Sequence, residues 1–288
     1  MKSFKSKQLT RYIYLMPIIV FIMLSVGLGL LMAIMESLAW SSGFPFSFYE
    51  QLFTKNTFVD SLFLSVRTAL LSTILSLIIG VLFTRTFIRY FKTDQWKYIV
   101  WVPMLIPHFV AAYIIFLLFS QTGWISAVIF QFDVIRDWEE FPIVVNSAAY
   151  IGVVMTYVWK EVPFVILMIF PIYQRLDFRY EDVVHTLGGK GWSVWTTVEF
   201  PWLWPILLET GLVIFSFILS AFEVPALLGV TYPKMLPVLA YEWFYEGDWS
   251  NRPLAQALMV SITILTITSS YLIFRLSHRW RNRLMKGG

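Results

Sequence analysis

Six long apolar runs decide what this chain can fold into. The chain has 288 residues, of which 58% are hydrophobic and 14% charged, whereas soluble domains carry about 25% charged residues. A membrane-spanning helix needs about 20 apolar residues, and six runs qualify. They cover residues 12–35, 61–84, 98–120, 147–172, 203–228 and 255–274. The sequence therefore predicts an all-α integral membrane protein with six transmembrane helices.

The first run follows four basic residues, as the core of a signal peptide would. Its apolar stretch is longer than such a core, and no clear small-x-small cleavage pattern follows it. We therefore expect this run to be retained as a membrane anchor. The predicted organisation is a short N-terminal segment, residues 1–11, a membrane domain, residues 12–274, and a basic tail, residues 275–288.

Basic residues alternate between the connections. Sixteen of the 22 Lys and Arg residues lie before the first run, in the second and fourth connections, or after the sixth run. Lys and Arg near the ends of spans resist translocation, so the basic side is predicted to be cytoplasmic. Both termini then lie in the cytoplasm. A nucleic-acid site would gather the basic residues on one face instead, so no nucleic-acid partner is expected.

The fourth connection, residues 175–201, combines helical spacing with three glycines. Five apolar residues recur on one face of a short helix: Leu176, Tyr180, Val183, Val184 and Leu187. Asp177 is suited to cap the start of this helix, and Gly188-Gly189 to stop it with a positive φ angle. A second short helix is predicted from Trp192 to Phe200, ending at Pro201.

The apolar face of the first short helix is expected to sit on the membrane bundle. Its polar face, which includes Glu181, Asp182 and His185, would then face a cytoplasmic partner. The residues alone leave two interpretations open, a docking element for that partner and a connection that only packs on its own bundle.

This connection resembles the EAA signature of permease subunits in binding-protein-dependent ABC importers: Glu-Ala-Ala, three residues, Gly, nine residues, Ile-x-Leu-Pro. Asp182-Val183-Val184 stands for Glu-Ala-Ala, with Glu181 just before it, and Gly188 follows at the right spacing. Val198 to Pro201 stands for the closing motif. Upstream, Trp159 to Phe164 resembles the Trp-x-x-x-Pro-Phe found in the preceding span of such permeases.

The resemblance implies the permease half of a type I importer in a bacterial inner membrane. The expected partners are membrane lipid, an identical or sister permease subunit, two cytoplasmic ATPase subunits and an extracytoplasmic solute-binding protein. ATP would be bound by the ATPase subunits, and no cofactor is expected in this chain. The residues that the resemblance assigns to ATPase coupling are Glu181, Asp182, Val183, Val184, His185, Leu187, Gly188, Gly189 and Pro201. Gly188→Asp is expected to uncouple the permease from the ATPase, and Gly189→Ala to be milder, because the signature tolerates alanine at that position.

No enzymatic or metal site is predicted. The fragment from Gly188 to Gly191 lacks the first glycine and the Ser or Thr of a phosphate-binding loop, so this chain should not hydrolyse ATP itself. The three histidines lie in separate segments, and the chain has no cysteine. His108, beside the kink that Pro103 and Pro107 predict in the third span, is interpreted as a packed, hydrogen-bonded side chain.

Charged residues inside the spans are costly in hydrocarbon and are functional candidates by default. Lys160, Glu161 and Glu223 are predicted to line the translocation pathway, with a structural bond from Glu223 to Lys160 or to the sister subunit as the alternative. The segment from Pro225 to Gly229 resembles the Pro-x-Leu-Leu-Gly of polyamine-, iron- and thiamine-type permeases, which favours a polyamine-like or other small cation. Oligosaccharides, phosphonates and inorganic anions stay open, as does a secondary transporter or channel as the alternative class.

The topology can be tested by site-directed labelling. Because the chain lacks cysteine, Trp138→Cys and Lys190→Cys each introduce a single thiol. We expect a membrane-impermeant maleimide added outside the cell to label position 138 but not position 190. Labelling of both positions from one side would contradict the predicted orientation.

Overall fold

The computed structural model describes residues 2–38, 46–90 and 96–286, which are helices joined by turns and loops. The chain divides into two compact units. The first comprises Met1–Asn56 and Ala240–Ser261, and the second comprises Thr57–Leu239 and Ile262–Gly288. Each unit is described by itself below.

Within the described residues, six segments are long and apolar enough to cross a membrane, which confirms the predicted all-α fold with six spans. They are Tyr14–Ser37, Asn56–Tyr90, His108–Gln131, Ile151–Arg175, Gly191–Ser220 and Trp249–Ser277. The predicted third and fifth spans are both interrupted in the structure, as detailed below.

The first unit contains α1 (Lys2–Ser37), α2 (Ser47–Thr54), the π-helix η3 (Glu242–Glu246), the 3₁₀ turn η4 (Trp249–Asn251) and the start of α13 (Arg252–Lys286). Ser37 Oγ and Tyr49 OH lie 2.8 Å apart, which ties α1 to α2. Gln256 Nε2 donates to Glu36 Oε2 at 3.3 Å. The apolar side chains of α1 are exposed along most of its length, as expected of a helix whose solvent is lipid.

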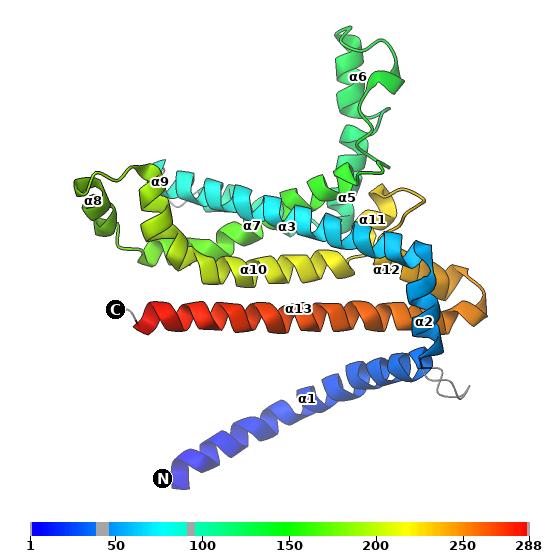
Figure 1. Cartoon of the computed structure of the whole chain (residues 1–288), viewed down its shortest axis with the longest axis horizontal. Coiled ribbons are helices and arrows are strands. Elements are labelled where there is room, and N and C mark those ends of the chain that lie inside the picture. Colours follow the sequence, from blue (N-terminus) through cyan, green and yellow to red (C-terminus); the bar gives the residue numbers. More distant parts are fainter. Residues whose placement is uncertain (1, 39–45, 91–95, 287–288) are drawn as a thin grey trace. The chain divides into compact units, whose positions relative to one another are not determined.

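The second unit is built on α3 (Asn56–Tyr90), α7 (Ile151–Arg175) and α10 (Phe200–Ser220), seen lengthwise in Figure 1. Two glycines allow close packing here. A Cβ atom at Gly80 would lie 2.6 Å from Val165 Cγ1 of α7, and one at Gly211 of α10 would lie 3.0 Å from Leu77 Cδ1 of α3. The buried face of α3 carries small hydroxyl residues from Ser61 to Ser76, typical of helix packing in membranes.

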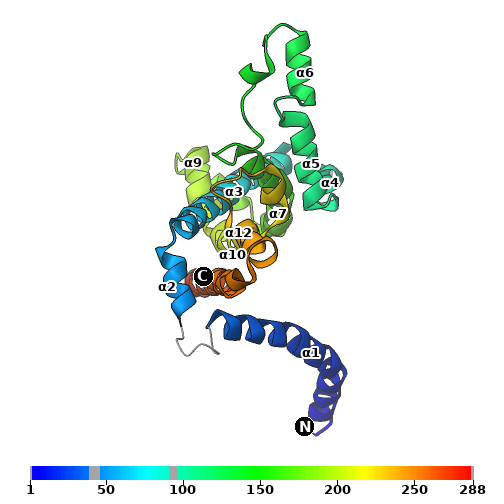
Figure 2. The ribbon, with the colours of Figure 1, turned by 90° about the vertical axis from the view of Figure 1, so that its right-hand side faces the viewer.

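The third span is two helices, α4 (Trp96–Leu105) and α5 (His108–Phe119), with α6 (Trp124–Gln131) beyond. In Figure 2 these three helices form one column. The break falls at Ile106 and Pro107, because Pro107 has no N–H to donate to the Pro103 carbonyl four residues earlier. The kink predicted from the two prolines is therefore a complete interruption of the helix.

The connection after α7 holds the short helix α8 (Arg179–Thr186), followed by α9 (Gly191–Val194) and the π-helix η2 (Trp195–Glu199). No gap separates η2 from α10, so the prediction that Pro201 ends a short helix is wrong. The π-helical segment shifts the ladder, and Phe200 N–H bonds to Trp195 O, five residues back. Pro201 sits in the first turn of α10, where its missing N–H costs little.

The predicted fifth span is shorter than expected at its far end. Helix α10 stops at Ser220, and two non-helical residues precede the short helix α11 (Glu223–Leu228). Helix α12 (Leu236–Tyr241) follows. Glu223 is consequently the first residue of a separate helix and not a residue inside a spanning one.

Candidate functional site

Helix α8 turns the opposite way from the sequence prediction. Tyr180 and Val183 of α8, and Leu187 just after it, are 61%, 54% and 83% exposed, whereas Leu176 and Val184 of the same predicted face are partly buried. Most of the face that was expected to sit on the bundle is therefore exposed. Glu181 was predicted to face away from the bundle, but its side chain is half-buried and points toward α3. The physical reason is an ion pair. A guanidinium on α3 stabilises Glu181 in this orientation more than contact with the bundle would stabilise an apolar side chain of α8. The exposed face of α8 is thus apolar.

The partner of Glu181 is Arg89 of α3. Arg89 Nη2 lies 3.0 Å from Glu181 Oε1 and 3.2 Å from Oε2. The same nitrogen lies 3.0 Å from Glu199 Oε1. One guanidinium therefore bridges the carboxylate of α8 and a carboxylate of η2.

Glu199 is the centre of this ion cluster, and its side chain is fully buried. Arg85 Nε donates to Glu199 Oε1 at 3.0 Å, and Tyr173 OH donates to Glu199 Oε2 at 2.9 Å. A buried carboxylate is costly unless it is paired and hydrogen-bonded, and here both oxygens have partners. We call Arg85, Arg89, Tyr173, Glu181 and Glu199 the loop-end ion cluster.

Gly188 and Gly189 are constrained in different ways. Gly188 has φ +80°, as predicted for the glycine that stops α8, and a Cβ there would meet open space. Gly189 has an ordinary φ, but its Cβ would lie 2.5 Å from Val184 Cγ1 and 2.9 Å from Val184 O. The expectation that Gly189 tolerates alanine better is therefore not supported, since the backbone oxygen leaves no room. His185 Nδ1 lies 3.0 Å from Gly189 O, which closes the same turn.

The N-cap position of α8 is occupied by Phe178, one residue after the predicted cap Asp177. Asp177 Oδ1 nevertheless accepts a hydrogen bond from the backbone N–H of Arg179, the first residue of α8, at 3.0 Å. The Arg179 side chain also donates to both carboxylate oxygens. These hydrogen bonds lower the pKa of Asp177 below its ordinary value. Asp182, one turn into the helix, is exposed.

Lys160 repairs the break in the third span. Its Nζ donates to the Pro103 and Ile106 carbonyls, each at 2.5 Å. The Pro103 carbonyl is the group that Pro107 leaves without its usual helical donor. The predicted structural bond from Lys160 to Glu223 is wrong, because the ammonium is held by these carbonyls. Glu223 is exposed at the start of α11.

Glu161 lies beside the same break. His108 Nε2 is 3.3 Å from Glu161 Oε1, so His108 is a hydrogen-bonded side chain as predicted. Lys160, Glu161 and His108 line a cavity of about 240 Å³ together with Met104, Phe164, Val213, Ile214 and Phe217. The cavity lies between α4, α5, α7 and α10, and it brings together two of the three predicted pathway residues.

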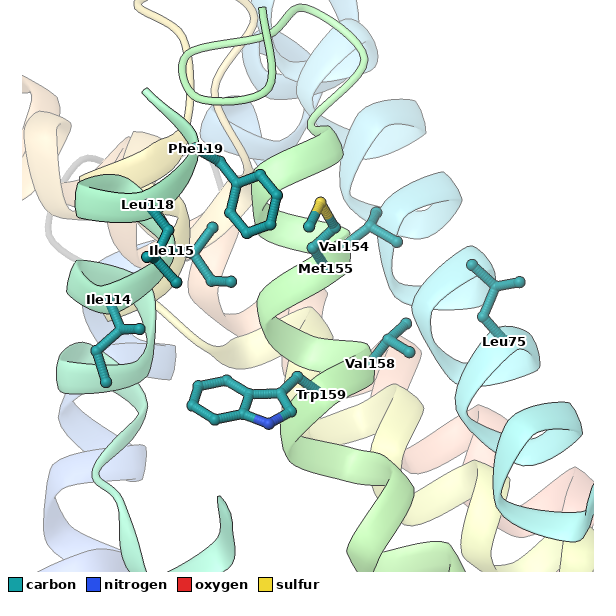
Figure 3. A pocket seen from close by; sticks show the side chains of 9 residues that line it. All are labelled: Leu75, Ile114, Ile115, Leu118, Phe119, Val154, Met155, Val158 and Trp159. Atoms are coloured by element: carbon teal, nitrogen blue, oxygen red, sulfur yellow. The ribbon is translucent and has the colours of Figure 1, made fainter. Parts of the chain in front are cut away.

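A larger cavity of about 460 Å³ has a different character. Figure 3 shows its lining on α3, α5 and α7, with the side chains of Ile115 and Val154 near its centre and Trp159 at one end. All nine lining residues are apolar: Leu75, Ile114, Ile115, Leu118, Phe119, Val154, Met155, Val158 and Trp159. This cavity offers nothing to hold a charged solute, whereas the smaller one carries an ammonium, an imidazole and a carboxylate.

The sequence reasoning missed most of the loop-end ion cluster. Arg85 and Arg89 belong to the basic second connection, from which the sequence predicts only membrane orientation. Glu199 stands at the variable position of the closing motif, Val198 to Pro201. One available signal was a carboxylate flanked by apolar residues at the base of a span. No group of three or more His, Cys, Asp or Glu suited to a metal ion occurs in the described part of the chain.

No protein-family model matches the chain, but curated relatives do. The chain is 26% identical over 206 residues to a probable sulfate transport system permease protein, cysT, from Marchantia polymorpha. That match covers 69% of this chain and 68% of the relative. This chain is also 27% identical over 165 residues to the molybdate/tungstate transport system permease protein WtpB of Thermococcus kodakarensis. That match covers 57% of this chain and 56% of the relative.

The fold is that of the permeases of ABC importers. A crystal structure of a bacterial ABC transporter involved in the import of the acidic polysaccharide alginate matches with a TM-score of 0.79 and 15% identity. The match covers 97% of this chain and 99% of the other. The sequence relatives are likewise named as permease proteins of transport systems. They do not support the polyamine-, iron- or thiamine-type branch expected from Pro225 to Gly229.

The repair of the helix break by Lys160 is testable. Lys160→Met keeps the length of the side chain but removes a donor to two carbonyls. Pro103 O keeps the Ile106 N–H at 3.3 Å, whereas Ile106 O loses the lysine, and an unsatisfied carbonyl in hydrocarbon costs several kcal/mol. We expect a loss of stability of about 2 kcal/mol or more, measured as a lower unfolding temperature in detergent. Lys190→Met, at an exposed lysine, is the control. Equal unfolding temperatures for the two variants would contradict the role.

Proposed function

We propose that this chain is the permease subunit of an ATP-driven importer for a small tetrahedral oxyanion such as sulfate or molybdate. The observation that carries the proposal is the set of relatives, named as sulfate and molybdate/tungstate permeases, on the fold of ABC importer permeases. The cationic solute favoured by the sequence is replaced by one of the inorganic anions that the sequence left open.

The coupling element is proposed to be α8 with its glycine turn. Tyr180, Val183 and Leu187 form an exposed apolar face on a helix that is itself outside the two spans it connects. In water such a face favours burial against a partner. We propose that it enters a groove of the ATPase subunit, with exposed Asp182 and His185 at its border and Gly188 and Gly189 shaping the turn beyond it.

The orientation follows from the charges. With the α8 loop in the cytoplasm, both termini are cytoplasmic and the basic connections face inward, as the positive-inside rule requires. The opposite side is acidic at Asp133, Asp137, Glu139 and Glu140. We propose that a solute-binding protein delivers the anion on that side of a bacterial inner membrane, and that an identical or sister permease completes the pathway.

The cavity of about 240 Å³ at Lys160 and Glu161 is proposed to belong to the translocation pathway. Lys160 has three N–H donors, of which two are held by carbonyls, so one is left for a passing anion. Glu161 and Glu223 are proposed to line the pathway without binding the anion, because a carboxylate repels it. Their negative charge favours rapid release over tight binding.

Transport by a purified system tests the function. The chain is reconstituted in proteoliposomes with its copurifying ATPase and its binding protein, and uptake of radiolabelled sulfate is followed. We expect uptake only when ATP is present on the ATPase side, with competition by molybdate and none by spermidine. Uptake driven by an ion gradient without ATP would instead identify a secondary transporter or channel.

The exposed face of α8 gives a second test. Leu187→Asp places a charge where an apolar contact is proposed, and burial of an unpaired charge is strongly unfavourable. We expect at least about a tenfold loss of ATPase bound during purification, equal to about 1.4 kcal/mol, while the permease stays inserted.

Thr186→Asp adds the same charge to the neighbouring exposed position and serves as the matched control for Leu187→Asp. If Leu187→Asp retains as much ATPase as Thr186→Asp does, the apolar face is not the docking surface.

A further inference from the structure

The loop-end ion cluster joins four separate elements through one buried carboxylate. Arg85 and Arg89 come from α3, Tyr173 from α7, Glu181 from α8 and Glu199 from η2. Because η2 runs into α10 without a gap, the cluster stands at the base of the helix whose Val213, Ile214 and Phe217 line the charged cavity. It therefore lies between the proposed docking helix and the proposed pathway.

The charges of the cluster balance. Two guanidinium groups face two carboxylates, and Arg89 is the member shared by both acids. Glu199 is buried, so it needs its cations for its own stability. Glu181 is at the edge of the cluster, with a side-chain exposure of 16%, and Arg89 itself is 38% exposed. The Arg89–Glu181 contact is consequently the part of the cluster that can be lost without exposing or stranding a buried charge.

The same contact is the polar link from α8 to the helices of the second unit. The other polar contacts described for α8 stay inside the loop: Arg179 with Asp177, His185 with Gly189 and Thr186 with Val183. Its apolar face adds little packing, since Tyr180, Val183 and Leu187 are exposed and Val184 is only partly buried. The orientation of α8 on the bundle thus depends on Glu181 more than on packing.

We propose that Arg89 and Glu181 are positioning residues that transmit displacement of α8 to Glu199 and so to α10. The inference rests on the proposed coupling function of α8, and it adds that the two neighbouring carboxylates have different roles. Glu181 faces inward and holds α8 to its own subunit. Asp182 is exposed and is the carboxylate that faces the ATPase.

A coupling measurement tests the proposal. In proteoliposomes holding the permease, its ATPase and its binding protein, the ATP hydrolysed per sulfate imported is measured for Glu181→Gln and Arg89→Gln. We expect Glu181→Gln to raise this ratio by about three- to tenfold, the range that loss of one hydrogen bond of typical net strength produces, and Arg89→Gln to raise it at least as much, because Arg89 also bonds Glu199. ATPase binding should be retained. An unchanged ratio in Glu181→Gln overturns the proposal.

A double-mutant comparison separates positioning from general damage. The Arg89→Gln/Glu181→Gln double variant should be no worse than Arg89→Gln alone, because Arg89→Gln already removes the contact with Glu181. Arg85 is the matched control, since it lies one turn away and bonds Glu199 but not Glu181. Combining Arg85→Gln with Glu181→Gln should multiply the effects. Multiplied effects in the Arg89 pair would overturn the proposal, and Arg89→Lys is expected to restore part of the coupling.

A second measurement needs neither sulfate nor transport. Spin labels are placed on Thr186→Cys in α8 and Trp202→Cys in α10, both exposed positions in a chain without cysteine. The distance distribution should be narrow in the otherwise wild-type chain and broad with Glu181→Gln. Equal widths overturn the positioning role. Absence of ATP-dependent uptake by the wild type would reject the proposed function, and the spin-label widths would still decide whether Glu181 holds α8.

Discussion

The need to satisfy every backbone polar group without water governs this structure. In hydrocarbon an unpaired carbonyl costs several kcal/mol, so a chain with two prolines in one span must supply a substitute donor. Lys160 of α7 does so at the Pro103 and Ile106 carbonyls. The break at Pro107 and the buried lysine are therefore two parts of one solution, and neither is stable in the membrane without the other.

Two buried charges in the second unit are satisfied in opposite ways. Lys160 donates hydrogen bonds to two carbonyl oxygens, which are dipoles and not counter-charges. Glu199 is held by two guanidinium groups and a tyrosine hydroxyl, an arrangement that ties three elements to one point. The first arrangement leaves Lys160 without a bound carboxylate, whereas the second holds Glu199 in a network of charge-assisted hydrogen bonds that keeps the three elements together.

The number of spans was predictable because a membrane-spanning helix can be identified from the length and apolar composition of its sequence alone. The stop of α8 at Gly188 was predictable too, since positive φ has a strong residue preference. The orientation of α8 was not. In a soluble protein an apolar face identifies the buried side, but here Tyr180 and Val183 are exposed while Glu181 turns inward to a cation.

Contacts over long sequence separations also escaped the sequence reasoning. Arg89 and Glu199 are 110 residues apart, and the sequence around each residue gives no sign that the two are in contact. The steric limit at Gly189 depends on Val184 O, a distance set by the turn and not by the residue type. The relatives do not support the polyamine-, iron- or thiamine-type branch, because a resemblance of five residues at Pro225 is too short to identify the solute.

The unbroken helical path from Gly191 to Ser220 has a mechanical consequence. The chain turns between α9 and α10 (Figure 1), so the straight part is α10, whose 21 residues at 1.5 Å each form a rod of about 32 Å. A rod of this length that tilts by about 10° about one end carries its other end through about 5 Å, since the displacement grows with length. A small tilt at the Glu199 end of α10 therefore becomes a displacement of several ångström at Ser220.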